Sequence, residues 1–335
     1  MEHVADWQLA HPAAWKSTEW ENGAFYAGVM ALSRLTAHPR FHDAMVRMGE
    51  SNQWQLGPSP YFADDHVVGQ TYAELYLQDH DPRFITPLQE RFDFILAHPR
   101  TSDLEFDWKR KPGNLDRWIW CDALFMAPPT WIRLWAATGR RAYLDFAVNE
   151  WWATSDYLYD RNEHLYFRDS TYFNRQEKNG RKVFWSRGNG WVMGGLVRML
   201  QFLPADHPAR ARFVQQFREM AVSVLACQQA DGLWRASLLD PVAFPMKETS
   251  GTGFFCYALA WGVNEGLLDP DRFTPSVHRA WAALVSFVTP EGILTHVQPI
   301  GTTPVTFDSA STEPYGVGAF LLAGSEVCRM GASVR

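Results

Sequence analysis

The sequence has few cysteines and no residue pattern that would hold a metal ion. Only four cysteines occur in 335 residues, and no two of them have CxxC spacing. The 11 histidines are isolated from one another. We therefore expect no metal and no cofactor. Because each cysteine lies in an apolar helical context, we expect buried free thiols at Cys121, Cys227, Cys256 and Cys328.

Long apolar runs and an excess of positive charge are also missing. No run reaches the ~18 apolar residues that span a bilayer, and the N-terminus lacks the basic and then apolar regions of a signal peptide. We expect no membrane association and a cytoplasmic protein, or a periplasmic one if a signal peptide was removed. The formal net charge of −6 argues against nucleic acid as a partner, because phosphates are bound by basic faces.

Several familiar catalytic motifs do not occur. The chain has no GxSxG nucleophile elbow, no Walker loop, no HExxH and no dinucleotide fingerprint. What the chain does have is aromatic residues, which make up 15% of it and include 16 tryptophans. Such an excess is typical of stacking on sugar rings, although core filling explains it equally well. No linker divides the sequence, so we expect one domain over 1–335.

A weak internal repeat indicates the fold. In each copy, a polar or glycine-bearing start is followed by small and aromatic residues that are apolar nearly all round a helix. The copies start 46 to 67 residues apart, which is room for two helices and their connections. The marker residues of the six copies are Gly23, Gly69, Ala123, Gly190, Gly251 and Gly316.

Between the copies lie amphipathic stretches with one apolar face, for example Phe41, Met45 and Met48. Six buried helices alternating with six one-faced helices predict an all-α fold, an (α/α)6 barrel of inner and outer helices. Before Asn22 only Val4 to Ala10 reads as helix, so we expect the first outer helix to be truncated. The connections near 103–118, 164–184, 232–247 and 292–312 are expected to build the site, with a short strand at 165–167.

Polar residues at the starts of the inner helices should converge at one end of the barrel. For each carboxylate among them, helix capping is an equally good explanation. These residues are Trp20, Glu21, Asn22, Asp64, Asp65, Asp122, Arg187, Asn189, Glu248, Ser250, Glu313 and Tyr315.

Asp122 differs from the other carboxylates because its sequence neighbours are apolar and offer no charge partner. Burial of such a group raises its pKa until it holds a proton, which is the state that a general acid requires. Asp64 is the natural partner, since a second carboxylate raises the pKa of one of the two. Arg187, between aromatic residues and glycine, is placed to bind a ligand carboxylate; the alternative is an ion pair with Glu248 or Glu313.

These residues resemble those of the unsaturated rhamnogalacturonyl hydrolases, glycoside hydrolase family 105, and more distantly those of the unsaturated glucuronyl hydrolases. The similarity runs from about Trp20 to Ala323. The tract Trp120-Cys121-Asp122-Ala123-Leu124-Phe125-Met126 fits the family's Trp-x-Asp-[Gly/Ala]-Leu-[Tyr/Phe]-Met segment, whose Asp is the proton donor. The resemblance also implies an (α/α)6 barrel.

Further motifs carry the family's functional residues onto this sequence. Asp64, five residues before Gly69, matches a second essential Asp; Asp65 does not, unless the match slips by one residue. Arg168 stands where some members have His, which puts the leaving sugar in doubt and favours a carboxylate or sulfate group. The resemblance implies Asp122 and Asp64 as catalytic residues. The expected substrate-binding residues are Trp20, Asn22, Arg168, Arg187, Trp191, Glu248, Ser250 and Tyr315.

The resemblance implies removal of a terminal 4,5-unsaturated uronic acid, galacturonyl or glucuronyl, from lyase-cut oligosaccharides by hydration of the C4=C5 double bond. We expect this oligosaccharide as the partner of a monomer or weak homodimer. Two alternatives remain open from the residues alone. One is an (α/α)6 glycosidase or lyase acting on saturated chains, and the other is a sugar-binding protein without activity.

Overall fold

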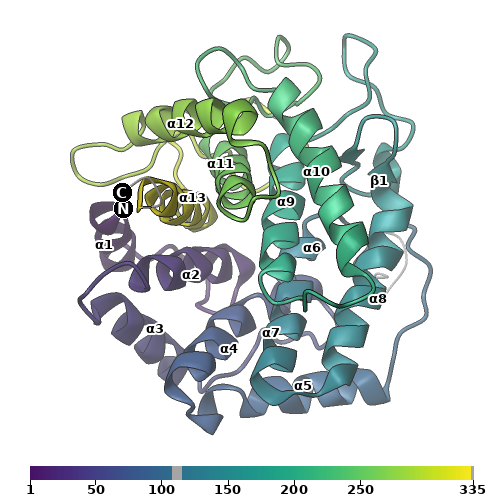
Figure 1. The fold of residues 1–335 in the computed structure, drawn as a ribbon, viewed down its shortest axis with the longest axis vertical. Coiled ribbons are helices and arrows are strands. Elements are labelled where there is room, and N and C mark those ends of the chain that lie inside the picture. Colours follow the sequence, from purple (N-terminus) through teal and green to yellow (C-terminus); the bar gives the residue numbers. More distant parts are fainter. Residues whose placement is uncertain (108–114, 333–335) are drawn as a thin grey trace.

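The computed structural model describes residues 1–107 and 115–332, and the chain is mostly helical (Figure 1). One set of helices is buried along nearly its whole length, as their small and apolar residues predicted; every residue of α9, for example, is buried. In chain order this inner set is α2 (Trp20–Ser33), α4 (Val68–Asp79), α6 (Ala123–Met126) with α7 (Pro128–Thr138), α9 (Ser186–Leu200), α11 (Thr249–Asn264) and α13 (Pro314–Ala332).

The inner helices contact one another in a closed circuit. Each packs against the next in chain order, and α13 returns to pack against α2. The third copy of the repeat differs from the others because its helix is broken at Ala127 into α6 and α7. Pro128 and Pro129 follow the break, and proline supplies no backbone N–H to continue the helical ladder.

A second set of helices lies outside the first, as Figure 1 shows. Each buries one face, and the face of α3 is formed by the predicted Phe41, Met45 and Met48. The first helix of this set has 9 residues, whereas the others have 12 to 18, so the expectation of a short first outer helix is confirmed. The set consists of α1 (Glu2–Ala10), α3 (Arg40–Ser51), α5 (Thr86–Ala97), α8 (Arg141–Leu158), α10 (Arg210–Ala226) and α12 (Pro270–Ser286).

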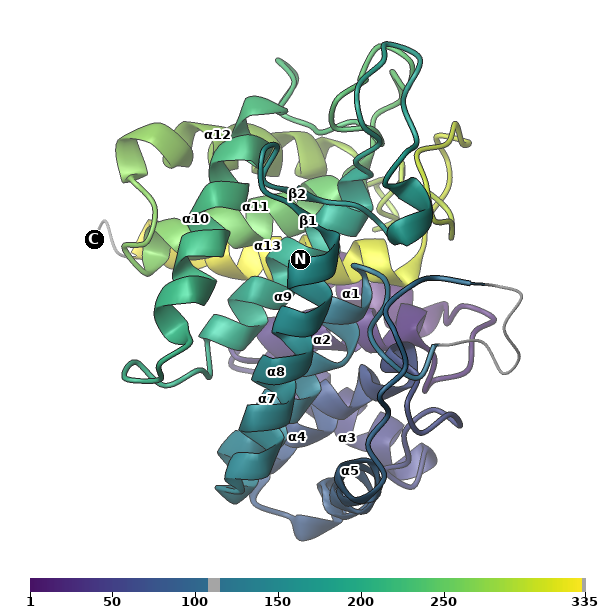
Figure 2. The ribbon, with the colours of Figure 1, turned by 90° about the vertical axis from the view of Figure 1, so that its right-hand side faces the viewer.

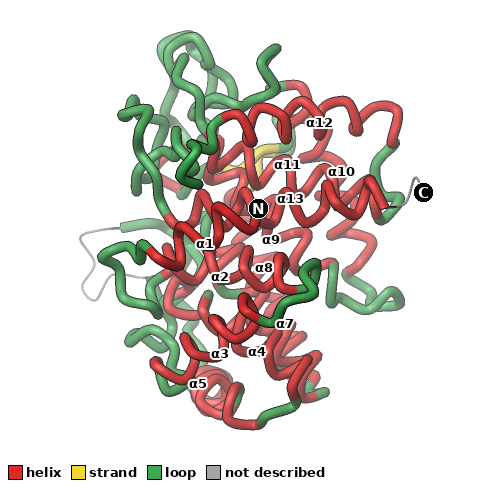
Figure 3. The backbone as a smooth tube through the Cα atoms, turned by 90° about the vertical axis from the view of Figure 1, so that its left-hand side faces the viewer, coloured by secondary structure: helices red, strands yellow, loops and turns green. Residues whose placement is uncertain are grey.

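The connections that precede the inner helices gather on one side of the molecule, to the right in Figure 2 and to the left in Figure 3. They include the 3-10 turns η1 (Ala63–His66) and η3 (Ser170–Tyr172), and the two-stranded hairpin β1 (Tyr159–Asp160) and β2 (Leu165–Tyr166). The strand predicted near 165–167 is therefore confirmed at 165–166. A further 3-10 turn, η2 (Pro82–Phe84), lies in the connection from α4 to the outer helix α5. Of the predicted loop 103–118, residues 108–114 lie outside the described residues.

A buried charge network joins three inner helices. Glu74 on α4 accepts hydrogen bonds from Arg133 on α7 at 2.6 Å and from Arg198 on α9 at 2.7 Å, and Arg34 at 2.8 Å completes the set. Burial alone would raise the pKa of Glu74, but the three guanidinium groups together hold it below its usual range. The carboxylate is therefore ionised and fully paired, which fixes the three helices relative to one another.

The cysteine expectation is confirmed for the free thiols and wrong for their burial. All four cysteines are free, but only Cys121 and Cys256 are buried, while Cys227 is half-buried and Cys328 is exposed. Cys328 lies near the end of α13, on the part of the helix that leaves the core. Among the described residues, every helix is too short or too polar to cross a membrane.

Two glycines let α2 and α13 approach closely, which closes the circuit of inner helices. A Cβ atom at Gly28 would lie 2.6 Å from the carbonyl oxygen of Gly318, and a Cβ at Gly318 would overlap the carbonyl oxygen of Ala24. These neighbours are backbone atoms, which cannot move aside as a flexible side chain can. The contact therefore requires glycine at both positions.

We expect Gly318→Ala to lower the free energy of unfolding by about 1–3 kcal/mol, because the added methyl group forces α2 and α13 apart. Chemical denaturation followed by far-UV circular dichroism measures the change. Gly331→Ala, on the same helix with no atom near its added Cβ, is the matched control and should cost nothing. Equal stability of the two variants would contradict this account of the helix contact.

Candidate active site

A cavity opens between the connection that precedes α2 and the connection that contains η1. Its wall includes Trp15, Trp20, Glu21, Phe62 and Asp64. Both connections lead into inner helices at the side where the long loops gather (Figure 2). The predicted convergence of inner-helix starts therefore brings Trp20 and Asp64 into one cavity, although 44 residues separate them in the chain.

Packing brings Asp64 close to Asp122. The ring of Phe62, two residues before Asp64, lies 5.4 Å from the ring of Trp120, two residues before Asp122. The Thr130 hydroxyl on α7 donates to the carbonyl of His66 at 3.0 Å, and the Gln70 amide on α4 donates to the carbonyl of Phe125 at 2.7 Å. These contacts hold η1 and the start of α4 against α6 and α7.

The two carboxyl groups influence each other's ionisation. Burial raises the pKa of Asp64 well above its usual range, and the negative charge of Asp122 raises it further, while Arg168 acts in the opposite direction. Burial also raises the pKa of Asp122, against the opposing charges of Arg168 and Arg187. Because the groups are coupled, the retained proton belongs to the pair, and Arg168 favours its residence on Asp64 in the free protein. In the described part of the chain, the Oδ1 atom of Asp64 is buried without a hydrogen-bond partner.

The sequence-based view that Asp122 has no charge partner is wrong. The Nε atom of Arg168 lies 3.7 Å from Oδ2 of Asp122, close enough for charge attraction and too far for a hydrogen bond. Arg168 is 46 residues away in sequence but arrives here because its carbonyl oxygen accepts a hydrogen bond from the Cys121 amide at 2.8 Å. The Nη1 atom of Arg168 donates a hydrogen bond to Asp169 at 2.7 Å, so Asp169 is the closer partner of Arg168. The carboxyl group of Asp122 is therefore not held in a hydrogen-bonded ion pair with Arg168.

The geometry separates the roles of Asp64 and Asp65. Asp65 accepts a hydrogen bond from the Ser59 amide at 2.7 Å, and its own carbonyl accepts one from Gly57 at 3.0 Å. Asp65 therefore shapes the loop at the cavity wall, whereas Asp64 lies close enough to Asp122 for their charges to interact. This placement supports the register that matches Asp64, and not Asp65, to the second carboxylate.

Three predicted aromatic residues form a layered support. The ring of Trp20 stacks on Tyr315 at 5.1 Å and meets the edge of Trp191 at 6.0 Å. Trp191 and Tyr315 are buried, whereas Trp20 is half-buried and lines the cavity. Of the three, Trp20 is the one placed to touch a ligand, and the other two hold its ring in position.

Arg187 is buried at 1% exposure between the rings of Trp185 and Tyr315, with its guanidinium carbon 4.5 Å and 4.9 Å from their centres. Its Nη atoms donate to the carbonyl oxygens of Gln298 and Pro299, the second at 3.0 Å. These backbone contacts replace the alternative ion pair with Glu248 or Glu313. The buried Nε–H of Arg187 finds no hydrogen-bond partner within residues 1–107 and 115–332.

Other predicted residues hold the framework of the site. Glu248 has 0% exposure and caps α11, accepting hydrogen bonds from the backbone amides of Ser250 at 2.8 Å and Gly251 at 2.7 Å. Ser250, equally buried, also donates its hydroxyl to Glu248. The side-chain amide of Asn22 donates to the carbonyls of Trp15 and Lys16 at 3.1 and 3.0 Å, which fixes the cavity wall. Direct substrate contact by these three side chains stays a prediction.

Glu21 belongs to the cavity but was not among the residues selected from the sequence as site residues. It appeared there only as one of several polar residues at helix starts, for which capping was an equal explanation. The structure places its side chain in the cavity wall, with Oε2 buried and without a hydrogen-bond partner among the residues that the structure describes. Sequence alone does not reveal this burial, because it depends on the start of α2 meeting η1 and the loop before it, which lie far apart in the chain.

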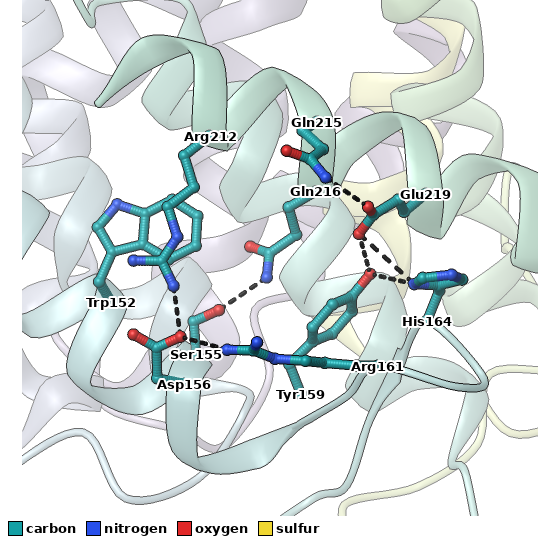
Figure 4. A pocket seen from close by; sticks show the side chains of 10 residues that line it. All are labelled: Trp152, Ser155, Asp156, Tyr159, Arg161, His164, Arg212, Gln215, Gln216 and Glu219. Atoms are coloured by element: carbon teal, nitrogen blue, oxygen red, sulfur yellow. Dashed lines mark hydrogen bonds and ion pairs between the residues drawn. The ribbon is translucent and has the colours of Figure 1, made fainter. Parts of the chain in front are cut away.

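A second pocket lies between the outer helices α8 and α10, beside the hairpin (Figure 4). At one end, the Tyr159 hydroxyl donates to Glu219 at 2.9 Å and lies 3.0 Å from Nδ1 of His164. At the other end, Asp156 pairs with Arg212 and, at 3.4 Å, with Arg161. Most polar groups of this pocket pair with one another, although the Nε1 atom of Trp152 has no hydrogen-bond partner in the described part of the chain. The pocket contains none of the residues predicted to form the site.

Comparison with known proteins places the chain among carbohydrate-active enzymes. The model of Glycosyl Hydrolase Family 88 matches residues 1–331. The unsaturated 3S-rhamnoglycuronyl hydrolase of Formosa agariphila is 38% identical over 97% of this chain and 88% of its own length. The resemblance inferred from the motifs is thereby confirmed, with family 88 as the matching model.

Solved structures agree with this assignment. A family 88 glycosyl hydrolase from Bacteroides vulgatus superposes with a TM-score of 0.87 and 32% identity, covering 98% of this chain and 97% of that chain. A second structure, described as a polysaccharide lyase, gives a TM-score of 0.87 and 33% identity, covering 99% and 98%.

At pH values above the ordinary pKa of an aspartate, Asp64 should lower the stability of the folded state. Its pKa is raised by folding, so the folded protein gives up the proton less readily than the unfolded chain does, and stability falls as the pH rises above ~4. We expect Asp64→Asn to raise the melting temperature at pH 7.5, with the gain shrinking toward pH ~4. Scanning calorimetry across this range measures it.

Asp206→Asn, at an exposed position, is the control and should leave the melting temperature unchanged at every pH. If Asp64→Asn melts below the unaltered protein at pH 7.5, the carboxylate stabilises the fold, and the assignment of a strained, buried acid is wrong.

Proposed function

The chain belongs to glycosyl hydrolase family 88, and from this membership we propose that it removes a terminal 4,5-unsaturated uronic acid from lyase-generated oligosaccharides by hydrating the C4=C5 bond. The observation that carries the proposal is the coupled pair of half-buried carboxyl groups Asp64, which lines the cavity, and Asp122. Such a pair retains a proton at a pH where an exposed carboxyl group has lost it. A carboxylic acid of this kind can protonate the electron-rich carbon of an enol ether.

The first chemical step is proton transfer. Asp122 delivers a proton to C4, and positive charge develops at C5 and the ring oxygen. Nearby Asp64, in its ionised form, stabilises this charge. In the free protein Arg168 draws the proton toward Asp64, but a uronate carboxylate that binds Arg168 neutralises the guanidinium. Arg168 then lowers the pKa of Asp122 less than before, so binding of the substrate favours protonation of Asp122.

In the second step, water adds at C5 and loses its proton to the carboxyl pair, which restores the proton that Asp122 gave up. The hemiketal formed at C5 opens and expels the remaining sugar from C1. No bond forms between the sugar and the enzyme, so the separation rule for ordinary glycosidase carboxylates does not apply. We assign Trp20 to ring stacking and Arg168 or Arg187 to the uronate.

The same membership supports a finer description of the fold. We propose a single (α/α)6 barrel over 1–335, because six buried helical units contact in a closed circuit and six one-faced helical units lie outside them. The site then lies at the barrel end where the inner helices begin. We propose a monomer or weak homodimer in solution, which sedimentation velocity measures.

We propose a 3S-rhamnose unit as the leaving sugar, and the support for this is the name of the Formosa agariphila relative, an unsaturated 3S-rhamnoglycuronyl hydrolase. Oligosaccharides cut by lyases from ulvan, rhamnogalacturonan and glycosaminoglycan are the substrates to compare. Each carries a conjugated double bond that absorbs in the ultraviolet, and hydration destroys this absorbance. The substrate whose absorbance falls fastest identifies the leaving sugar.

A lyase acting on saturated chains is the second candidate, favoured by the description of one similar structure as a polysaccharide lyase. The two activities change the ultraviolet absorbance in opposite directions. A lyase creates the double bond, so absorbance rises on an uncut polysaccharide, whereas the proposed hydrolase lowers the absorbance of a lyase product. One spectrophotometer trace with each substrate distinguishes them.

Asp122→Asn should lower kcat by about 10²–10⁴-fold, because an amide cannot supply the proton. Loss of ultraviolet absorbance measures turnover, and quenching of tryptophan fluorescence measures substrate binding, which should persist. The exposed Asp206→Asn is the control and should keep full activity. A folded Asp122→Asn enzyme with undiminished kcat would rule out Asp122 as the acid.

A further inference from the structure

Glu21 is a buried acid that the reaction described above does not use. It lies in the first turn of α2, next to the stacking residue Trp20, and lines the same cavity as Asp64. Its residue exposure is 4%, and its Oε2 atom is buried without a hydrogen-bond partner in the described part of the chain. The side chain is therefore at the ligand cavity with an unused polar atom.

Three acidic residues are the charged neighbours of Glu21. Glu19 lies directly before α2, Glu313 lies in the connection before α13, and Asp64 lies in η1. Burial is the main cause that raises the pKa of Glu21 to about 7, and the charges of Glu19 and Glu313 add to it, against its own backbone N–H. Tyr315 on α13, the support of Trp20, also feels its charge.

Helix stabilisation does not account for this arrangement. An acidic residue in a first helical turn stabilises the helix when it is ionised and exposed. Glu21 is buried, and no ion pair joins it to a cation among residues 1–107 and 115–332. A glutamine of the same size would fill the space without the cost of burying a charge. The acid is therefore better explained by a ligand than by the fold.

The ligand of the cavity is itself anionic. A terminal uronic acid brings a carboxylate next to Asp64 and Asp122, so a third ionised carboxyl group would repel it. An uncharged carboxylic acid does the opposite, because its O–H donates a hydrogen bond to a sugar hydroxyl or carboxylate oxygen. The unpartnered Oε2 atom is in position to carry that O–H.

We propose that Glu21, as an uncharged carboxylic acid, is a further substrate-binding residue that donates a hydrogen bond to the terminal unsaturated uronic acid and excludes this anionic sugar once it ionises. This role rests on the proposed function, since the ligand is the substrate named there. Glu21 is then a specificity residue, because the uronate binds when the Glu21 carboxyl group is protonated.

The test uses Asp122→Asn, which binds substrate without consuming it, and the unsaturated disaccharide that the unaltered enzyme hydrolyses fastest. We expect Kd from tryptophan fluorescence to be constant below pH ~7 and to rise up to about tenfold per pH unit above it, because the acid form of Glu21 binds. In Asp122→Asn combined with Glu21→Gln, which stays neutral and keeps a donor, Kd should be flat to pH 8.5. Glu90→Gln, exposed on α5, is the control and should keep the rise.

A second measurement needs no change at Glu21. At pH 8, binding to Asp122→Asn should take up a proton, which calorimetry in buffers of different ionisation enthalpy detects. The inference is overturned if no proton is taken up, or if Glu21→Gln keeps the alkaline rise in Kd. It is also overturned if Glu21→Gln alone binds substrate but loses turnover, since Glu21 would then transfer a proton. Failure of the proposed function looks different: the unaltered enzyme leaves the double bond of every lyase product intact.

Discussion

Burial of Asp64 beside Asp122 is the interaction on which the site depends. Each carboxyl group is costly to ionise away from water, and each makes ionisation of the other more costly. Arg168 relieves part of this cost from 3.7 Å without pairing closely with Asp122, because Asp169 is its nearer partner. The result is a pair that keeps a proton yet is not locked in an ion pair, which is the condition that protonation of an alkene carbon requires.

Partners, and not burial alone, decide what a carboxyl group does in this protein. Glu74 is buried more completely than Asp64, but three arginines surround it and hold its pKa low, so it serves as a fixed anion that ties α4, α7 and α9 together. Burial and the like charge of Asp122 instead raise the pKa of Asp64, whose Oδ1 atom has no hydrogen-bond partner among the described residues. Glu74, with its close cationic partners, thus makes the helical framework rigid, whereas Asp64 lies at the cavity without such close partners.

The helical pattern could be predicted from the sequence because it depends on local composition. Small and apolar residues all round a helix predicted the buried set, and one-faced stretches such as Phe41 to Met48 predicted the outer set. The same logic located Asp122, since an acid among apolar residues is conspicuous. The break at Ala127, which two prolines follow, was not among the features predicted from the sequence.

Contacts between distant connections could not be predicted in the same way. The approach of Arg168 to Asp122 depends on one backbone hydrogen bond to Cys121, and the burial of Glu21 depends on the start of α2 meeting the segment around η1. Capping also hid the roles of residues at helix starts: Glu248 is a cap, as the simpler explanation held, while Glu21 is not. Sequence pattern identifies which residues reach the site, whereas side-chain partners determine what each one does there.

The unpartnered atoms of the site explain why an acidic sugar suits it. Among residues 1–107 and 115–332, Glu21 and Asp64 each have a buried oxygen, and Arg168 and Arg187 each a buried Nε, that makes no hydrogen bond. Burying such atoms is costly, because each of them has lost water without gaining a hydrogen bond within the described chain. A neutral sugar would offer hydroxyl groups to the oxygens but no charge to the guanidinium groups. A uronic acid offers both kinds of partner in one ring, so its binding recovers more of the cost that folding incurred.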